Sequence, residues 1–320
     1  MTRNPVRTTT RFVSTHATDV RINHQAIESL AQEWSRKKIT IPQWQSPIHL
    51  NSHDEKILLI YVIVLDSMNF CFWQKGKQWS IRYRGKTYSR SAAFETSLTR
   101  FFKTYPQKAN FKFFSQISKK ELADIFIGIG QIPLLEKRQK ILRAVSHTME
   151  KKYNGDPRLL LKKAGRKLSR LIPLIVKELP SFNDEARYRD KKIYLWKRAQ
   201  ILAADIYGAL RGKNDAAFTD LNYLTLFADY RLPQLMQYLG ILEYSPHLEK
   251  KIKKQQLIPA GSREEIEIRS ATIQAGEFLR HAFTKHGKKL YPHELDWLLW
   301  KKAKSIRMDI PHHLTKTTNY

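Results

Sequence analysis

The chain has 320 residues and a formal net charge of +28, since 57 Lys and Arg residues face only 29 Asp and Glu. With 42% hydrophobic residues and only 12 Gly and 13 Pro, it is not a low-complexity, collagen-like or wholly disordered chain. A single cysteine, Cys71, excludes an intrachain disulfide framework, and no Cys and His residues have the spacing of a structural zinc site. The composition therefore predicts a folded protein with a sizeable apolar core.

The first residues are polar and basic with no apolar segment behind them, unlike a secretory signal. The longest apolar run, 57–65, is well short of the ~20 residues of a membrane helix. We therefore expect a cytoplasmic protein. The positive charge is compatible with nucleic-acid binding, but the basic residues are spread along the chain in short groups, which is typical of a solvated surface.

In chain order, the pattern begins with a Thr- and Arg-rich stretch, 1–18, which lacks periodicity and is expected to form a flexible basic arm. Apolar residues at helical spacing predict a helix over 20–34. The run 57–65 is compatible with either a buried strand or the core of a helix, because a continuous apolar run has no informative period. Alternating residues over 78–90, with Gly85 and Lys86 as the turn, predict a β-hairpin.

After the hairpin the periodicity is helical. Apolar residues at spacings of three and four predict helices over 91–102, 119–126, 134–151, 156–178, 191–210, 220–230, 233–242, 263–284 and 294–305. No linker and no internal repeat divides these segments. We therefore predict a mainly α fold, in which residues 19–320 form a single helical domain with one small β-hairpin.

Motifs of phosphate loops, Rossmann cofactors, zincins and α/β-hydrolase nucleophiles are absent from the sequence. Residues 65–73 nevertheless place Asp66 and Asn69 beside Phe70 and Trp73. This arrangement suits a site that stacks a planar ring and binds its edge through an amide. The alternative is the end of an element, capped by Asp66, with its aromatic residues in the core.

Residues 194–205 place two cations, Lys197 and Arg198, near the start of a helix, with Gln200 away from the centre of its apolar face. Adjacent cations at such a position bind phosphate through charge-assisted hydrogen bonds. The alternative is that both are ordinary solvated residues. Similarly, the chain end over 311–320 either frays or folds back against the rest of the protein.

Residues 219–234 carry two acids, Asp220 and Asp229. Asp220 suits an N-cap, and Pro233 suits the first residue of the next helix, so the segment predicts two short helices joined as a helix-hairpin-helix. Asp229 lies at the joint, where a carboxylate reaches a cleft from a fixed backbone. The alternative is that Asp220 only caps a helix and Asp229 only pairs with Arg231.

Taken together and in this order, the segments resemble the queuosine salvage protein family, the queuosine 5′-phosphate N-glycosylase/hydrolases. The resemblance covers residues 18–320 and rests on the following stretches: LDSMNFCFW (65–73), IRYRGKTYS (81–89), WKRAQILAADIYGAL (196–210), LTLFADYRLPQLMQYLGIL (224–242), EIEIRSATIQAGEFL (265–279), LDWLLW (295–300) and HHLTKTTNY (312–320). It implies a helical fold similar to helix-hairpin-helix DNA glycosylases. It also implies hydrolysis of queuosine 5′-phosphate to queuine and ribose 5-phosphate, without a metal or other cofactor.

The implied reaction builds positive charge on the anomeric carbon of the sugar, so an ionised carboxylate is expected to stabilise the transition state and to orient water. Asp229 and Asp220 are the candidates, and the sequence does not rank them. The implied partner is the small nucleotide alone, with no obligate nucleic acid and no membrane, and the chain is taken as a monomer.

The resemblance also implies how the substrate is bound. Aromatic stacking on the deazapurine is expected, at about 1–3 kcal/mol per base. The expected contacts are, for stacking, Phe70, Trp73, Phe227 and Tyr230; for the base edge, Asn69 and Gln234; for the cationic amine of queuine, Asp66 and Glu277; for the phosphate, Lys197, Arg198, His313, Lys316 and Tyr320; and, elsewhere in the site, Gln200 and Arg231.

Two other functions are compatible with the residues. The charge of +28 and the predicted helix-hairpin-helix suit a protein that binds nucleic acid without sequence preference. A glycosylase that removes damaged bases from DNA is the second alternative. Steeply salt-dependent duplex binding without queuine release would favour the first, and base release from DNA but not from the free nucleotide would favour the second.

Overall fold

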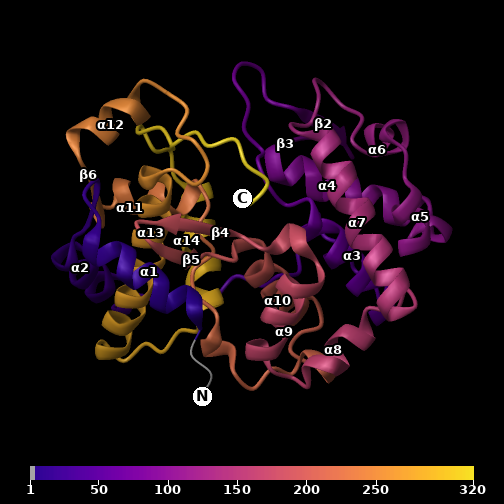
Figure 1. Ribbon diagram of the computed structural model, residues 1–320, viewed down its shortest axis with the longest axis horizontal. Helices are drawn as coiled ribbons and strands as arrows, with labels where there is room; N and C mark the ends of the chain where they lie inside the picture. Colours follow the sequence, from indigo (N-terminus) through magenta and orange to yellow (C-terminus); the bar gives the residue numbers. More distant parts are fainter. Residues whose placement is uncertain (1–3) are drawn as a thin grey trace.

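The structure is a computed structural model that describes residues 4–320, and it is mainly helical, as predicted (Figure 1). The described chain contains fourteen α-helices and three two-stranded antiparallel sheets. The helices are α1 (Pro5–His16), α2 (His24–Ser35), α3 (Glu55–Ser67), α4 (Arg90–Thr104), α5 (Phe111–Gln116), α6 (Lys119–Ile125), α7 (Leu135–Tyr153), α8 (Arg158–Ala164), α9 (Leu168–Glu178), α10 (Lys197–Ala209), α11 (Arg231–Tyr238), α12 (Pro246–Lys253), α13 (Arg263–Lys285) and α14 (Pro292–Ser305). The strands are β1 (Val20–Ile22), β2 (Ser80–Tyr83), β3 (Lys86–Ser89), β4 (Glu185–Tyr188), β5 (Lys191–Tyr194) and β6 (Leu242–Tyr244).

The hairpin predicted over 78–90 is confirmed as β2 paired with β3. Its turn is Arg84 and Gly85, one residue earlier than predicted, because Lys86 pairs with Tyr83. Both turn residues have positive φ, as a tight two-residue hairpin turn requires. Two other strand pairs, β4 with β5 and β1 with β6, were not predicted. The prediction of a helix from residue 191 was wrong at its start, because β5 comes first. Helix α10 begins only after Trp196, whose backbone has the left-handed conformation.

Helix α3 settles the element that the sequence left open. The Asp54 side chain accepts a hydrogen bond from the N–H of Ile57 (3.1 Å) and so caps the helix at its start. Residues 58–67 are all buried. An apolar helix that is covered on every side has no polar face, and therefore its sequence shows no helical period.

The helix predicted over 220–230 does not exist. Only a single 3₁₀ turn, Leu221–Tyr223, follows Asp220. Both carboxylate oxygens of Asp220 accept hydrogen bonds from the start of α9, from the N–H groups of Leu168 (2.7 Å) and Ser169 (3.0 Å). Asp220 is therefore a cap, but for a helix that begins 52 residues earlier in the chain, which sequence spacing does not reveal.

Side chains from two other helices hold the rest of this segment in an irregular path. The side-chain oxygen of Gln200 accepts the N–H of Thr225 (2.9 Å), and Asp296 accepts the N–H of Phe227 (2.8 Å). With only one helix present, the predicted helix-hairpin-helix is wrong at this place. Helix α11 does form, capped by Asp229, and Pro233 is its third residue rather than its first.

The prediction of a flexible arm is wrong for residues 5–16, which form α1 and pack on α13. Val6, Thr10 and Val13 lie on one face of α1 and are completely buried. The side chain of Gln274 on α13 donates hydrogen bonds to Thr10 Oγ1 (2.8 Å) and to the carbonyl of Arg7 (3.0 Å). The sequence pattern did not indicate this buried face of α1, because a polar threonine stands between its two valines. Residues 1–3 of the predicted arm lie outside the described part of the chain.

Two large apolar clusters form the interior. The first joins α3, α4, α7, α9 and α10, and the second joins α2, α11, α13 and α14. In Figure 1 the purple and magenta helices α3–α7 lie on one side of the molecule, α2 and α11–α13 lie on the other, and the yellow chain end runs between them. Within residues 4–320, no helix is long and apolar enough to cross a membrane.

Candidate functional site

Several predicted site residues meet where the chain end folds back. A small buried cluster, which we call the tail cluster, contains Phe70, Cys71, Trp73, Tyr230, Leu314 and Tyr320. It joins the segment after α3, the residue before α11 and the end of the chain. The N–H of Cys71 donates a hydrogen bond to the main-chain oxygen of Tyr320 (2.8 Å), so the tail is tucked in rather than frayed. Figure 1 shows the chain end between helices α3–α7 and the group formed by α2 and α11–α13.

Asp66 lies in the last turn of α3 and is completely buried. Its Oδ1 atom accepts a hydrogen bond from Asn69 Nδ2 (3.1 Å), whereas Oδ2 has no hydrogen-bond partner among residues 4–320. Burial raises the pKa of Asp66 to about 7, although Asn69 and the charge of Lys197 oppose the shift. Asp66 therefore exchanges its proton close to neutral pH.

Lys197 is the first residue of α10, and only 5% of it is exposed. In the described part of the chain its ammonium group forms no ion pair within 4.0 Å. Burial lowers the pKa of Lys197, and the charges of Asp229, Asp66 and Asp296 act in the opposite direction. Lys197 is thus a buried cation among carboxylates, not the solvated residue of the alternative interpretation.

Two further acids, which the sequence analysis did not single out, belong to the same group. Asp296 on α14 is 5% exposed, and burial raises its pKa well above the usual value, despite the hydrogen bond from Phe227. Burial, and then the charge of Asp66, also raise the pKa of Asp205 on α10 well above its usual value. Asp66, Asp205, Asp229, Asp296 and Lys197 form what we call the acid group.

The structure separates the two catalytic candidates. Asp229 is half-buried, and its Oδ1 atom accepts the N–H groups of Arg231 (2.7 Å) and Leu232 (3.0 Å). No described residue donates a hydrogen bond to its Oδ2 atom. Asp220, in contrast, commits both oxygens to the start of α9. Asp229 therefore combines a fixed backbone with an uncommitted oxygen, and Asp220 does not.

Two of the four predicted stacking residues lie around His312, a tail residue that the sequence analysis did not assign. The ring of Tyr230 lies 4.6 Å from the His312 ring at 35°, and Trp73 approaches it edge-on at 6.4 Å. Phe70 is enclosed instead by two guanidinium groups, of Arg138 (4.4 Å) and Arg198 (5.3 Å). Phe227 is buried in the first large cluster.

Four predicted binding residues use their side chains to hold the fold. Arg198 donates hydrogen bonds to the carbonyls of Ser67 (2.8 Å) and Ser181. Gln200 is completely buried and bonds to Thr225. Gln234 donates to the carbonyl of Ile310 (2.6 Å) and accepts from Arg231, whose guanidinium also reaches the carbonyl of Ala303. The contacts to the carbonyls of Ala303 and Ile310 anchor the segment that leads to the tail.

The remaining predicted residues differ in their placement. His313 is buried, with Nε2 3.3 Å from the hydroxyl of Tyr320, and burial lowers the pKa of His313 to about 3. It is therefore neutral at physiological pH. Lys316 is exposed. Glu277, predicted to bind the queuine amine, instead pairs with Arg7 on α1 (2.9 Å) and does not join the acid group.

Sequence reasoning missed several buried charged residues: Arg138, Asp184, Glu265, Arg269 and Asp296. A usable signal existed for Asp296, because it is the one charged residue in the apolar stretch 295–300. Charged residues are rarely buried without a partner. Within residues 4–320, no three His, Cys, Asp or Glu side chains are grouped so as to hold a metal ion.

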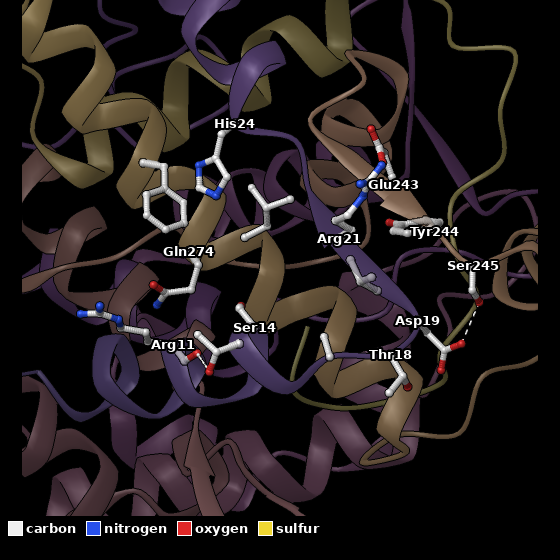
Figure 2. A pocket seen from close by; sticks show the side chains of 15 residues that line it. Arg11, Ser14, Thr18, Asp19, Arg21, His24, Glu243, Tyr244, Ser245 and Gln274 are labelled. Carbon is white, nitrogen blue, oxygen red and sulfur yellow. Dashed lines mark hydrogen bonds and ion pairs between the residues drawn. The ribbon is translucent and has the colours of Figure 1, made fainter.

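Two surface hollows of similar size lie elsewhere. One, of about 640 Å³, is bordered by α1, β1, β6 and α13, and Figure 2 shows Arg11, His24, Tyr244 and Gln274 around it. The other, of about 610 Å³, lies beside Trp44, Tyr207, His293 and Trp297. None of the predicted site residues lines either hollow, so size alone does not locate the candidate site.

The titration of Asp66 makes a prediction for stability. Between its usual pKa of 3.8 and about 7, the folded protein retains a proton that the unfolded chain has lost. The free energy of unfolding therefore falls as pH rises through this window, by about 1.4 kcal/mol per pH unit from this group. We expect Asp66→Asn to remove this contribution, as measured by urea unfolding at about pH 5 and about pH 6.5.

Asp156→Asn is the matched control for this measurement. The ion pair with Arg158 lowers the pKa of Asp156, so this group makes the free energy of unfolding vary with pH only below about pH 3.8. The control should show the same change in the free energy of unfolding between the two pH values as the unmodified protein. The same change in Asp66→Asn would contradict the prediction.

Comparison with known proteins places the chain in a family. The sequence model described as "queuosine salvage protein" matches residues 48–320, and the chain belongs to this family. A protein of Sphaerobacter thermophilus named queuosine 5′-phosphate N-glycosylase/hydrolase is 38% identical, over 98% of this chain and 97% of its own length. Proteins of the same name from Mus musculus and Schizosaccharomyces pombe are 33% and 30% identical, over 98% and 92% of this chain and 98% and 89% of their own lengths.

Proposed function

We propose that this chain hydrolyses the N-glycosidic bond of queuosine 5′-phosphate and so releases queuine for salvage into tRNA. The observation that carries the proposal is the end-to-end similarity to proteins with that activity in their name, at 38% identity over 98% of the chain for the Sphaerobacter thermophilus protein. The reaction consumes only water. The bond between the sugar and the base nitrogen breaks, the water oxygen bonds to the anomeric carbon, and a proton goes to the departing base.

Asp229 is the residue that we assign to the sugar. As the bond breaks, positive charge develops on the anomeric carbon, and a fixed carboxylate stabilises it without having to reorganise. Two main-chain N–H groups fix one oxygen of Asp229, which leaves the other for the sugar or for the attacking water. The buried cation of Lys197 favours the ionised form of the neighbouring acids.

Asp66, Trp73 and Tyr230 are assigned to the base. Tyr230 and Trp73 offer aromatic surface near the chain end, which suits a flat deazapurine. Asp66 suits the cationic amine of queuine, since its ionised form gains a partner when that amine binds. Of the cations expected at the phosphate, Lys197 lies among the acids, Arg198 is committed to carbonyls and His313 is neutral, so the exposed Lys316 remains the favoured contact.

Incubation with queuosine 5′-phosphate and, separately, with the nucleoside queuosine tests the proposal. We expect release of queuine with a kcat/KM about 100-fold higher for the phosphate, since charge-assisted hydrogen bonds contribute about 1.5–3 kcal/mol each. Equal efficiencies would contradict the assignment of a phosphate site. No release, together with steeply salt-dependent duplex binding, would favour a nucleic-acid-binding protein instead.

A further inference from the structure

A buried ion pair between Arg269 and Asp184, which we call the hub, links the residues that we assign to catalysis. Arg269 on α13 and Asp184, the residue before β4, are only 1% and 2% exposed. The guanidinium group meets the carboxylate with two parallel hydrogen bonds, one of them 3.1 Å from Nη1 to Oδ1. Nη1 also donates to Glu265 Oε1 (3.2 Å), one helical turn earlier. Such a two-pronged pair fixes orientation as well as distance.

Two further contacts of Arg269 lead toward predicted site residues. Arg269 Nε donates to the carbonyl of Ala228 (3.2 Å), the residue immediately before Asp229. The guanidinium carbon lies 4.4 Å from the centre of the Tyr320 ring, within cation–π distance. The hub therefore contacts both the segment that carries Asp229 and the end of the tail.

Asp184 connects the same hub to the start of α10. Its Oδ2 atom accepts the N–H of Lys197 (3.3 Å), and its main-chain oxygen accepts the N–H groups of Leu195 (3.0 Å) and Trp196 (3.2 Å). Trp196 has a φ of 49°, an unfavourable conformation for a tryptophan, which surrounding contacts must maintain. The contacts of Asp184 thus determine where Lys197 begins its helix.

We propose that the Arg269–Asp184 pair is a positioning unit that sets Asp229, Lys197 and Tyr320 relative to one another. This inference rests on the proposed function and adds two residues to it. A buried ion pair is weak evidence for stability, because the cost of removing two charges from water offsets their attraction. Its contacts to Lys197, to Tyr320 and to Ala228, the residue before Asp229, give it a different role, in which misplacement by about 1 Å lowers turnover by about 100-fold.

Two conservative variants test the unit. Asp184→Asn keeps the shape of the side chain but loses its charge, and Arg269→Lys keeps the charge but cannot reach Asp184, Glu265 and Ala228 together. At a temperature well below unfolding, we expect each variant to lower kcat for queuosine 5′-phosphate by about 100-fold and to change KM by less than about threefold. If the hub only balanced charge, Arg269→Lys would retain the unmodified kcat.

Leu142→Ala is the control for lost stability, since Leu142 is a completely buried residue of α7 without a contact to the hub. It should lower Tm by at least as much as the hub variants and still retain kcat within about threefold. A retained kcat in both hub variants would overturn the inference. If the unmodified protein releases no queuine, the proposed function fails. Crystal structures of Asp184→Asn then test the positioning role on its own. Unshifted Ala228–Asp229 and Trp196–Lys197 backbones would overturn the inference.

Discussion

Asp229→Asn is expected to lower the rate of queuine release about 1,000-fold while substrate is still bound. The amide oxygen of Asn can accept the same N–H groups of Arg231 and Leu232, so the cap of α11 survives. What disappears is the negative charge opposite the developing sugar cation, and the loss of one such electrostatic contribution costs about 100- to 1,000-fold in turnover. Single-turnover release of queuine, with ligand binding measured separately, tests this expectation.

Asp220→Asn is the matched control, because the two acids come from the same segment and both act as caps. Weakening the cap of α9 is expected to cost about 1 kcal/mol of stability without a change in kcat. The reverse outcome, with turnover lost in Asp220→Asn and retained in Asp229→Asn, would exchange the assignments of the two residues.

Lys197→Met is expected to lower kcat/KM about 100-fold at neutral pH, and equally for the phosphate and the nucleoside. Met has similar length but no charge, so Asp66 and Asp296 lose a cation that lowers their pKa values, and they hold their protons to higher pH. Part of the lost activity should therefore return as pH rises. Rates for both substrates over a range of pH provide the measurement.

The comparison of substrates separates two roles for Lys197. A loss confined to queuosine 5′-phosphate would assign the ammonium group to the phosphate, as the sequence pattern suggested, and would contradict its role among the acids. Lys162→Met, at an exposed lysine of α8, serves as the control and should leave both rates unchanged.

The fold was predictable wherever a helix has one apolar face and ends at a local signal. α4, α7 and α13 lie within a few residues of their predicted bounds for this reason. The segment 224–230 was not predictable, because its path depends on hydrogen bonds from Gln200 on α10 and Asp296 on α14. Short strands such as β4 and β5 were missed because four residues carry too little periodicity.

The candidate site shows a similar limit. Resemblance to a family pointed to Asp66, Lys197 and Asp229, but the sequence did not show that Lys197 and Asp66 are both buried. Asp220 and Asp229 differ in their hydrogen-bond partners, which are distant in one case and local in the other, and our proposal of Asp229 rests on this difference, which no sequence pattern shows. The Arg269–Asp184 pair joins residues 85 positions apart, and no local pattern marks such a partner.

The packing of α1 on α13 has a consequence for biosynthesis. Gln274 and the carbonyl that it contacts in Arg7 are 267 positions apart. At a translation rate of about 5–20 residues per second, the first helix waits roughly 13–50 s for its partner to be synthesised. During this interval its apolar face is open to chaperones and proteases, and ribosome-bound chains that stop before α13 should be cleaved readily within the first helix.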